Sequence, residues 1–217
     1  WYARRKEETD SKVLKEALEI WIRLLAPFAP YICEEIWNKM EKEGFISLAK
    51  WPKYNEKKVN IQEEETENLI KNVLEDTSNI LRATKMVPKK ICYYSAAPWK
   101  WKVYLMALKK SVSTKITLND LMKGLMTNLD LKKMAEKVSK FARQIVEEIN
   151  QMPEDKKQRQ LQTGPMDENK TLKEAETFFG REFNAKIHIY REDDPQRHDP
   201  KKKGELARPY RPAIYME

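Results

Sequence analysis

Glycine, cysteine and histidine are scarce in this sequence, whose 217 residues include five Gly, two Cys and two His. No Gly-rich loop of the kind that binds nucleotide phosphates is present. The patterns CxxC, HxxH and HExxH are also missing, so no group of side chains has the spacing of metal ligands. We therefore expect neither a metal site nor a cofactor site within this chain.

Residues able to act as a general acid or base are also few. His188 alternates with Ile187 and Ile189, which predicts that it faces away from them and toward the surface. His198 lies in a charged stretch, and neither histidine has a nucleophile or a carboxylate at a suggestive spacing. We predict no catalytic residues, and we expect the chain to bind a partner rather than to catalyse a reaction.

Long apolar runs are absent too, since none approaches the roughly 20 residues that a membrane helix requires. No signal peptide is recognisable at the first residues. Cys33 and Cys92 lie singly in apolar runs, which is typical of small buried side chains in a reducing compartment. We expect a cytoplasmic protein and, because the sequence starts at Trp1 without Met, a piece of a longer chain.

Charge is abundant and unevenly distributed along the chain. The net charge is +8, but residues 61–84 carry 2 basic and 6 acidic side chains, a balance of −4. Residues 85–217 carry 28 basic and 18 acidic side chains, a balance of +10. The excess of positive charge in this last part predicts contact with a polyanion.

The first third of the sequence has the periodicity of helices. Apolar residues recur at helical spacing over 10–26, and Pro27 ends this helix because proline lacks an amide hydrogen. Pro30 is suited to the first turn of a second helix, which Gly44 would end. A third apolar stripe over 61–85 completes a predicted helical bundle, domain 1–87.

After Val87 the pattern changes to short apolar runs between helices. Strands are predicted near 90–95, 186–191 and 212–216, and a long helix follows Asp130 as its N-cap. The polar stretch 154–170 is predicted to be a loop. The fold class is therefore mainly α, α+β: a helical bundle followed by a small α/β domain with a short sheet, residues 88–217.

Basic and aromatic side chains are interleaved at the start of the second domain, an arrangement suited to RNA because cations contact phosphates and rings stack on bases. The alternative is that the rings are core side chains and the lysines a solvated surface. Near the end of the chain two prolines would hold a rigid arm, which loses less entropy on binding. The predicted binding residues are Lys89, Lys90, Trp99, Lys100, Lys102, Lys109, Lys110, Arg208, Tyr210 and Arg211.

Two parts of the sequence resemble a known family. The run Leu-Ala-Pro-Phe-Ala-Pro-Tyr at 25–31, then Glu-Glu-Ile-Trp at 34–37 and Trp51-Pro52, resembles the helical anticodon-binding domain of class Ia aminoacyl-tRNA synthetases for leucine, isoleucine and valine. The strand at 90–95 with Pro-Trp-Lys at 98–100, and the ending Arg-Pro-Ala-Ile-Tyr-Met-Glu at 211–217, resemble the archaeal and eukaryotic type of leucyl-tRNA synthetase.

This resemblance implies a parent ligase that joins leucine to its tRNA with ATP, through catalytic signatures that this sequence lacks. It implies a monomeric parent whose bundle touches the tRNA body and whose C-terminal domain reaches the long variable arm of leucine tRNA. The residues implied to read that arm are Arg211, Pro212, Ala213, Ile214, Tyr215 and Glu217. The alternatives are a helical scaffold that binds another protein and the equivalent domain of an isoleucyl or valyl enzyme.

Overall fold

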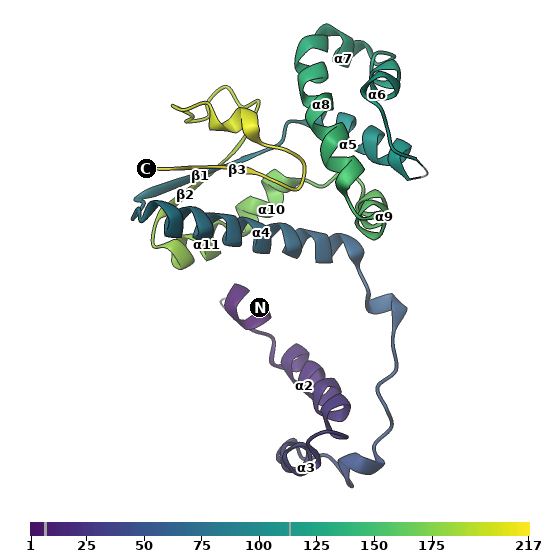
Figure 1. Ribbon diagram of the computed structural model, residues 1–217. Helices are drawn as coiled ribbons and strands as arrows, with labels where there is room; N and C mark the ends of the chain where they lie inside the picture. Colours follow the sequence, from purple (N-terminus) through teal and green to yellow (C-terminus); the bar gives the residue numbers. More distant parts are fainter. Residues whose placement is uncertain (7, 113) are drawn as a thin grey trace. The chain divides into compact units, whose positions relative to one another are not determined.

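The computed structural model describes residues 1–6, 8–112 and 114–217. The chain is mainly helical with one three-stranded sheet (Figure 1), which confirms the predicted fold class. It divides into two compact units, residues 1–59 and residues 60–217. Each unit has its own buried core.

The first unit is built on two helices that meet at the predicted proline corner. The Asp10 carboxylate caps the first of them by accepting from the Lys12 amide at 2.8 Å, and Pro30 occupies the first turn of the second. The second helix ends at Lys39, before Gly44, so the predicted end was placed too late. The helices are α1 (Tyr2–Arg5), α2 (Ser11–Leu25), α3 (Pro30–Lys39), η1 (Ile46–Leu48) and η2 (Glu56–Lys58).

The core of the first unit is small and consists of Ile22, Cys33, Trp37 and Ile46. Ile22 is the buried residue of α2, whereas most of the apolar stripe predicted to pack is exposed, with Trp21 64% exposed. The periodicity of residues 10–26 thus predicted the helix correctly. The apolar residues that it predicted to be buried are, however, mostly exposed in the structure.

The second unit contains the long helix α4 (Ile61–Thr84) and the sheet. The three strands have the order β2–β1–β3, with β1 parallel to β2 and antiparallel to β3, and all three were predicted. The remaining elements follow in chain order: β1 (Lys90–Ser95), α5 (Pro98–Ser111), α6 (Leu118–Leu125), α7 (Leu129–Lys133), α8 (Ala135–Gln151), α9 (Glu154–Thr163), α10 (Glu168–Glu174), α11 (Glu176–Phe183), β2 (Lys186–Arg191), η3 (Lys203–Leu206) and β3 (Ala213–Met216).

Two predictions for this unit are wrong, one about a helix start and one about a loop. Asn128, not Asp130, is the N-cap, and it opens the short α7 before α8 begins at Ala135. The stretch 154–170 is not a loop, because it contains α9 and the start of α10. Acidic residues in the first turn of α9 stabilise this helix through its dipole. However, α9 has few apolar residues, so the sequence shows no helical periodicity there.

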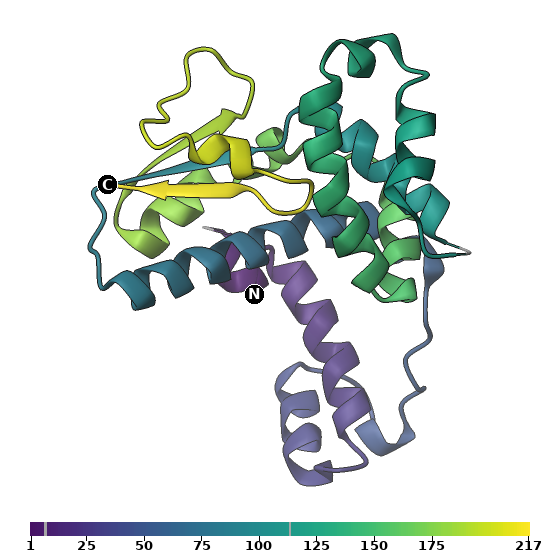
Figure 2. The same ribbon diagram turned by 45° about the horizontal axis from the view of Figure 1, so that its top comes forward.

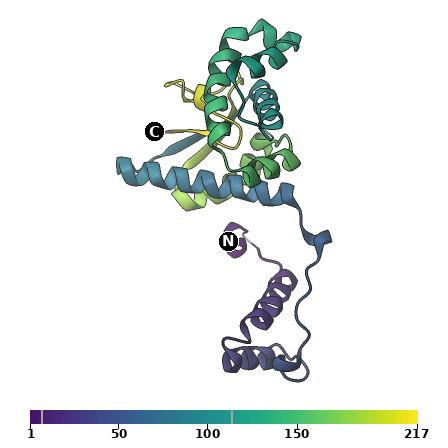
Figure 3. The same cartoon turned by 45° about the vertical axis from the view of Figure 1, so that its right-hand side comes forward.

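Helix α4 packs inside the second unit. Its residues Leu69, Ile70 and Val73 share a core with Tyr93 of β1 and Phe179 of α11. Figure 3 shows α4 as one continuous helix running along the sheet and helices of this unit. The structural division therefore falls before α4, whereas the predicted domains 1–87 and 88–217 placed it with the helices of the first unit.

The two faces of the sheet have different neighbours. Side chains at Ile91, Tyr93 and Ile187 belong to the core shared with α4 and α11. The opposite face carries Cys92 and Tyr94, and the loop containing η3 lies on that side, away from α4 (Figures 1 and 2). Helices α5, α6 and α8 pack on one another beside the sheet around a further apolar cluster.

Candidate nucleic-acid interface

The predicted basic and aromatic segment on β1 and α5 separates into buried rings and exposed lysines. Trp101 and Tyr104 are core residues, as the alternative interpretation held. Trp99 is partly buried, with its ring edge-on to Phe141 at a centroid distance of 5.3 Å. The lysines at 89, 102, 109 and 110 are exposed, so within this segment the cations, rather than the rings, are available to a partner.

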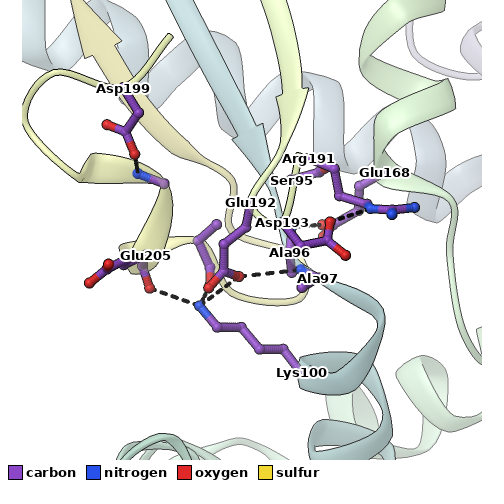
Figure 4. A network of polar contacts seen from close by, with 12 residues as sticks. Ser95, Ala96, Ala97, Lys100, Glu168, Arg191, Glu192, Asp193, Asp199 and Glu205 are labelled. Carbon is purple, nitrogen blue, oxygen red and sulfur yellow. Dashed lines mark hydrogen bonds and ion pairs between the residues drawn. The ribbon is translucent and has the colours of Figure 1, made fainter. Parts of the chain in front are cut away.

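Lys100 does not lie on this exposed surface, which corrects the prediction that it contacts phosphate. Its side chain is buried, and its ammonium lies 2.9 Å from the Glu192 carboxylate (Figure 4). The same ammonium donates to the carbonyl oxygens of Glu205 at 2.8 Å and Ala207 at 2.7 Å. Burial lowers the pKa of Lys100, while the contact with Glu192 opposes this shift. Lys100 is thus fully occupied by partners inside the protein.

Glu168 of α10 is a second buried ionisable side chain, and no sequence pattern pointed to it. Its carboxylate accepts hydrogen bonds from the amides of Ala96 at 3.1 Å and Tyr210 at 2.6 Å. Burial raises the pKa of Glu168 to about 8 although both amides favour the charged form. Lys100 and Glu168 together fasten the segment before β3 to the junction between β1 and α5 (Figure 4).

The end of the chain is the strand predicted near 212–216, but the segment before it is a hydrogen-bonded turn, which corrects the predicted proline-stiffened arm. Arg208 and Arg211 pair across a turn in which Tyr210 has a positive φ of 62°. The Tyr210 ring packs on Trp101 at a centroid distance of 5.1 Å. Pro212 is buried, and β3 then continues as an edge strand beside β1.

The final residues are also bonded to β1. The backbone oxygen of Glu217 accepts from the amides of Lys89 and Lys90, and its carboxylate lies 2.9 Å from the Lys90 ammonium. Lys90, together with His198, holds the pKa of Glu217 at about 2. Lys90 and Glu217 therefore neutralise each other at the surface.

The other terminal positions differ in how accessible they are. Arg208 is paired with Glu148 of α8 at 2.8 Å, whereas the Arg211 side chain is exposed. Ala213, Ile214 and Tyr215 are partly buried in β3. Among the predicted terminal residues, Arg211 is thus the cation that is open to a partner.

A further set of exposed cations lies on α6, α7 and α8, where no binding residue was predicted. Residues 118–151, which hold these three helices, carry 6 basic and 5 acidic side chains, a balance of +1, and the longer stretch 98–163, which adds α5 and α9, has a balance of +7. The uneven charge of the sequence placed the positive excess within residues 85–217, whereas the interleaved aromatic residues pointed to α5. The exposed cations here are Lys123, Lys132, Lys133, Lys137, Lys140 and Arg143.

Within residues 1–6, 8–112 and 114–217, no group of His, Cys, Asp and Glu is arranged to hold a metal ion. In those same ranges no helix combines the length and the apolar character needed to cross a membrane. Cys33 and Cys92 are buried free thiols, in agreement with the sequence interpretation.

Comparison with known proteins identifies relatives of this chain. Residues 1–92 match the family described as the anticodon-binding domain of tRNA ligase. All of the chain aligns with leucine–tRNA ligases of archaea, at 39% identity for Methanosarcina barkeri, 35% for Pyrococcus abyssi and 32% for Methanocaldococcus jannaschii. The chain is homologous to part of the archaeal leucine–tRNA ligases. It spans about a fifth of their length, 21–22%.

The homology confirms the resemblance stated from the sequence for both parts of the chain. The anticodon-binding match includes the first unit, α4 and the start of β1, so the family boundary at residue 92 and the structural division before Asn60 differ. The matched family domain thus extends across the division between the two compact units.

Proposed function

We propose that this chain is the tRNA-binding portion of a leucine–tRNA ligase. The parent enzyme joins leucine to its tRNA with ATP at a catalytic site in the part of the ligase that this chain does not span, and it acts as a monomer in the cytoplasm. The observation that carries the proposal is the alignment of the whole chain with leucine–tRNA ligases. The partner is leucine tRNA, through its body and its long variable arm.

The charge distribution supports an RNA partner. The exposed lysines of α5 to α8 and the exposed Arg211 belong to the second unit, where the balance of charge is positive. Such side chains contact phosphates and release counterions on binding, so binding weakens as salt concentration rises. A surface of this kind favours affinity for any RNA, and leucine tRNA specificity requires further contacts.

A gel-shift experiment with purified leucine, serine and valine tRNAs tests the proposal. We expect leucine tRNA to bind most tightly, with affinity falling steeply as salt increases. Serine tRNA controls for the long variable arm, and valine tRNA controls for a short one. The absence of a complex with leucine tRNA even at low salt would overturn the proposal.

A point substitution is a sharper test of the variable-arm contact than truncation, because removing residues 208–217 would remove β3 from the sheet. Arg211→Ala changes an exposed side chain and should weaken binding of leucine tRNA more than binding of valine tRNA. Lys39→Ala is the matched control, since it removes an exposed cation from the first unit. Equal losses for both tRNAs would refute a role in reading the variable arm.

A scaffold that binds another protein is the second function to weigh. Phe28 and Tyr31 at the proline corner of the first unit are 85% and 90% exposed, more than is usual for such side chains. This function would be favoured if the chain bound a partner protein with an affinity that does not depend on salt concentration and did not bind RNA. Another alternative is that the chain is the equivalent domain of an isoleucyl or valyl enzyme. A charging assay of the full parent enzyme decides this, because it shows which amino acid is joined to tRNA.

A further inference from the structure

One face of the sheet carries a row of rings. The strand register places Tyr94 beside Tyr190, and Cys92 between His188 and Tyr215, all with side chains on the same face. The rings of His188 and Tyr190 lie 6.2 Å apart and only 11° from parallel. Tyr190 and Tyr94 lie 6.1 Å apart at 22°. We call His188, Tyr190 and Tyr215 the aromatic face.

The loop before β3 covers only part of this side of the sheet. Tyr94 is fully buried there, since its hydroxyl donates to the His198 carbonyl and Gly204 lies against its ring. The three residues of the aromatic face are only partly buried. Figures 1 and 2 show this loop on the side of the sheet opposite α4, as expected if it shields one portion of that face.

Cations lie around the aromatic face. The Lys201 ammonium is 6.0 Å from the centre of the Tyr215 ring, and the exposed Lys186 precedes His188 on the same side of β2. His188 and Lys186 also line a hollow of about 520 Å³ at the outer edge of β2, together with Lys173 of α10. Glu176 is the acidic residue in that hollow. Rings with parallel faces next to lysines are the arrangement that binds unpaired nucleotides.

We propose that the aromatic face binds unpaired RNA nucleotides. Bases stack on Tyr190 and His188, while the phosphates between them pass over the hollow beside Lys173 and Lys186. The inference rests on the proposed function and adds the form of RNA that is bound, single-stranded rather than duplex. A duplex offers only its backbone to such a face, because its bases are already stacked on one another.

The test uses the full chain and a short single-stranded RNA that carries a fluorescent base analogue. Wild type should quench the analogue on binding and should bind the same sequence as a duplex more weakly. Tyr190→Leu keeps an apolar side chain but removes the ring, and we expect its affinity for the single strand to fall about tenfold. Tyr190→Phe keeps the ring and should bind like wild type.

Two controls separate stacking from general effects. Tyr54→Leu removes an exposed tyrosine of the first unit and should leave single-strand affinity unchanged. Lys186→Gln should weaken binding and reduce its salt dependence, without loss of quenching in the complex that still forms. If Tyr190→Leu does not fold by circular dichroism, His188→Leu, two residues earlier on the same strand, replaces it.

The outcomes distinguish this inference from the proposed function. The proposal that the aromatic face binds unpaired nucleotides is overturned if Tyr190→Leu has unchanged affinity for the single strand. It is also overturned if wild type binds single strand and duplex equally. Neither result affects the proposal that the chain binds tRNA. Failure of wild type to bind leucine tRNA overturns the proposed function instead. Selective loss of single-strand binding, with tRNA still retained through its backbone, supports both.

Discussion

At the scale of single residues, two buried ionisable side chains hold the end of the chain in place. Lys100 and Glu168 extend from different helices and bond to backbone groups of the segment that leads into β3. Each is satisfied by several partners, as a buried polar group must be. The terminal strand is therefore fixed by side chains far from it in sequence.

Replacing Lys100 should destabilise the protein rather than simply weaken RNA binding. In Lys100→Met the Glu192 carboxylate loses its cation, and such a break costs roughly 3–5 kcal/mol of unfolding free energy. Urea denaturation measures this loss. The double variant Lys100→Met with Glu192→Gln should recover part of it, and Lys102→Met, at an exposed position, is the control. A Lys100→Met variant that is as stable as wild type but binds RNA more weakly would support the original prediction that Lys100 contacts phosphate.

Glu168 makes stability depend on pH in a defined window. Its pKa is about 8 in the folded chain and near 4.5 when unfolded, so between these values only the folded chain keeps the proton. Stability from this group is thus greatest below pH 4.5 and falls as pH rises toward 8. About 1.4 kcal/mol per pKa unit sets an upper limit of roughly 5 kcal/mol on this fall.

The neutral variant Glu168→Gln isolates this effect. The unfolding free energy of the wild type should decrease between pH 4.5 and 8, and that of Glu168→Gln should not. Thermal melts across that pH range measure the difference. Glu147→Gln, at an exposed position on α8, should follow wild type. Parallel curves for wild type and Glu168→Gln would show that Glu168 ionises normally.

Trp37 belongs to the packing of the first unit. It is buried with Ile22, Cys33 and Ile46, and its indole nitrogen has no hydrogen-bond acceptor among the residues that the structure describes. Trp37→Ala should cost about 3–5 kcal/mol and unfold this small unit first, as seen by circular dichroism. Trp51→Ala, at an exposed site, is the control. A well-folded Trp37→Ala that loses tRNA would show that the RNA site lies here.

At the scale of elements, α4 shows how one helix can be predicted correctly and assigned to the wrong neighbours. Its apolar stripe at Leu69, Ile70 and Val73 was evident from periodicity, but a stripe does not specify what covers it. In the structure those residues pack with β1 and α11. The hydrogen bond between Thr77 and Tyr93, at 3.0 Å, adds a polar contact between α4 and the sheet.

Excision of the second unit tests this assignment. A fragment of residues 60–217 should unfold in a single cooperative transition, because it keeps the core shared by α4 and the sheet. A fragment of residues 88–217 leaves Ile91, Tyr93 and Phe179 uncovered and should lose cooperative unfolding. Calorimetry compares the two. Equal stability of both fragments would support the division at residue 87 instead.

At the scale of the whole molecule, the excess positive charge belongs to the second unit, where exposed lysines lie on each of the helices α5 to α8. Phosphate contacts by these helices predict that each lysine removed lowers the slope of log affinity against log salt by about 0.9 for duplex nucleic acid. Lys132→Ala with Lys133→Ala, both exposed on α7, should reduce this slope for leucine tRNA. Lys57→Ala with Lys58→Ala in the first unit is the matched control. Identical slopes would place the phosphate contacts elsewhere.

The amino-acid sequence alone determined the helices with strong periodicity, the proline corner, all three strands and the family. These features depend on local spacing and on short motifs, which a linear pattern contains. It missed α9, whose sparse apolar residues give no stripe, and it misplaced the cap of the long helix. It also located the charge excess correctly as a segment of the chain.

Only the tertiary structure decided which side chains are available to a partner. Lys100 and Lys102 are neighbours of the same type on one helix, yet one is buried among carbonyl oxygens and the other is exposed. His188 and Tyr190 form a ring row with Tyr94 because β1 and β2, distant in sequence, pair in parallel. Burial and proximity of this kind depend on contacts between remote segments, which sequence periodicity does not encode.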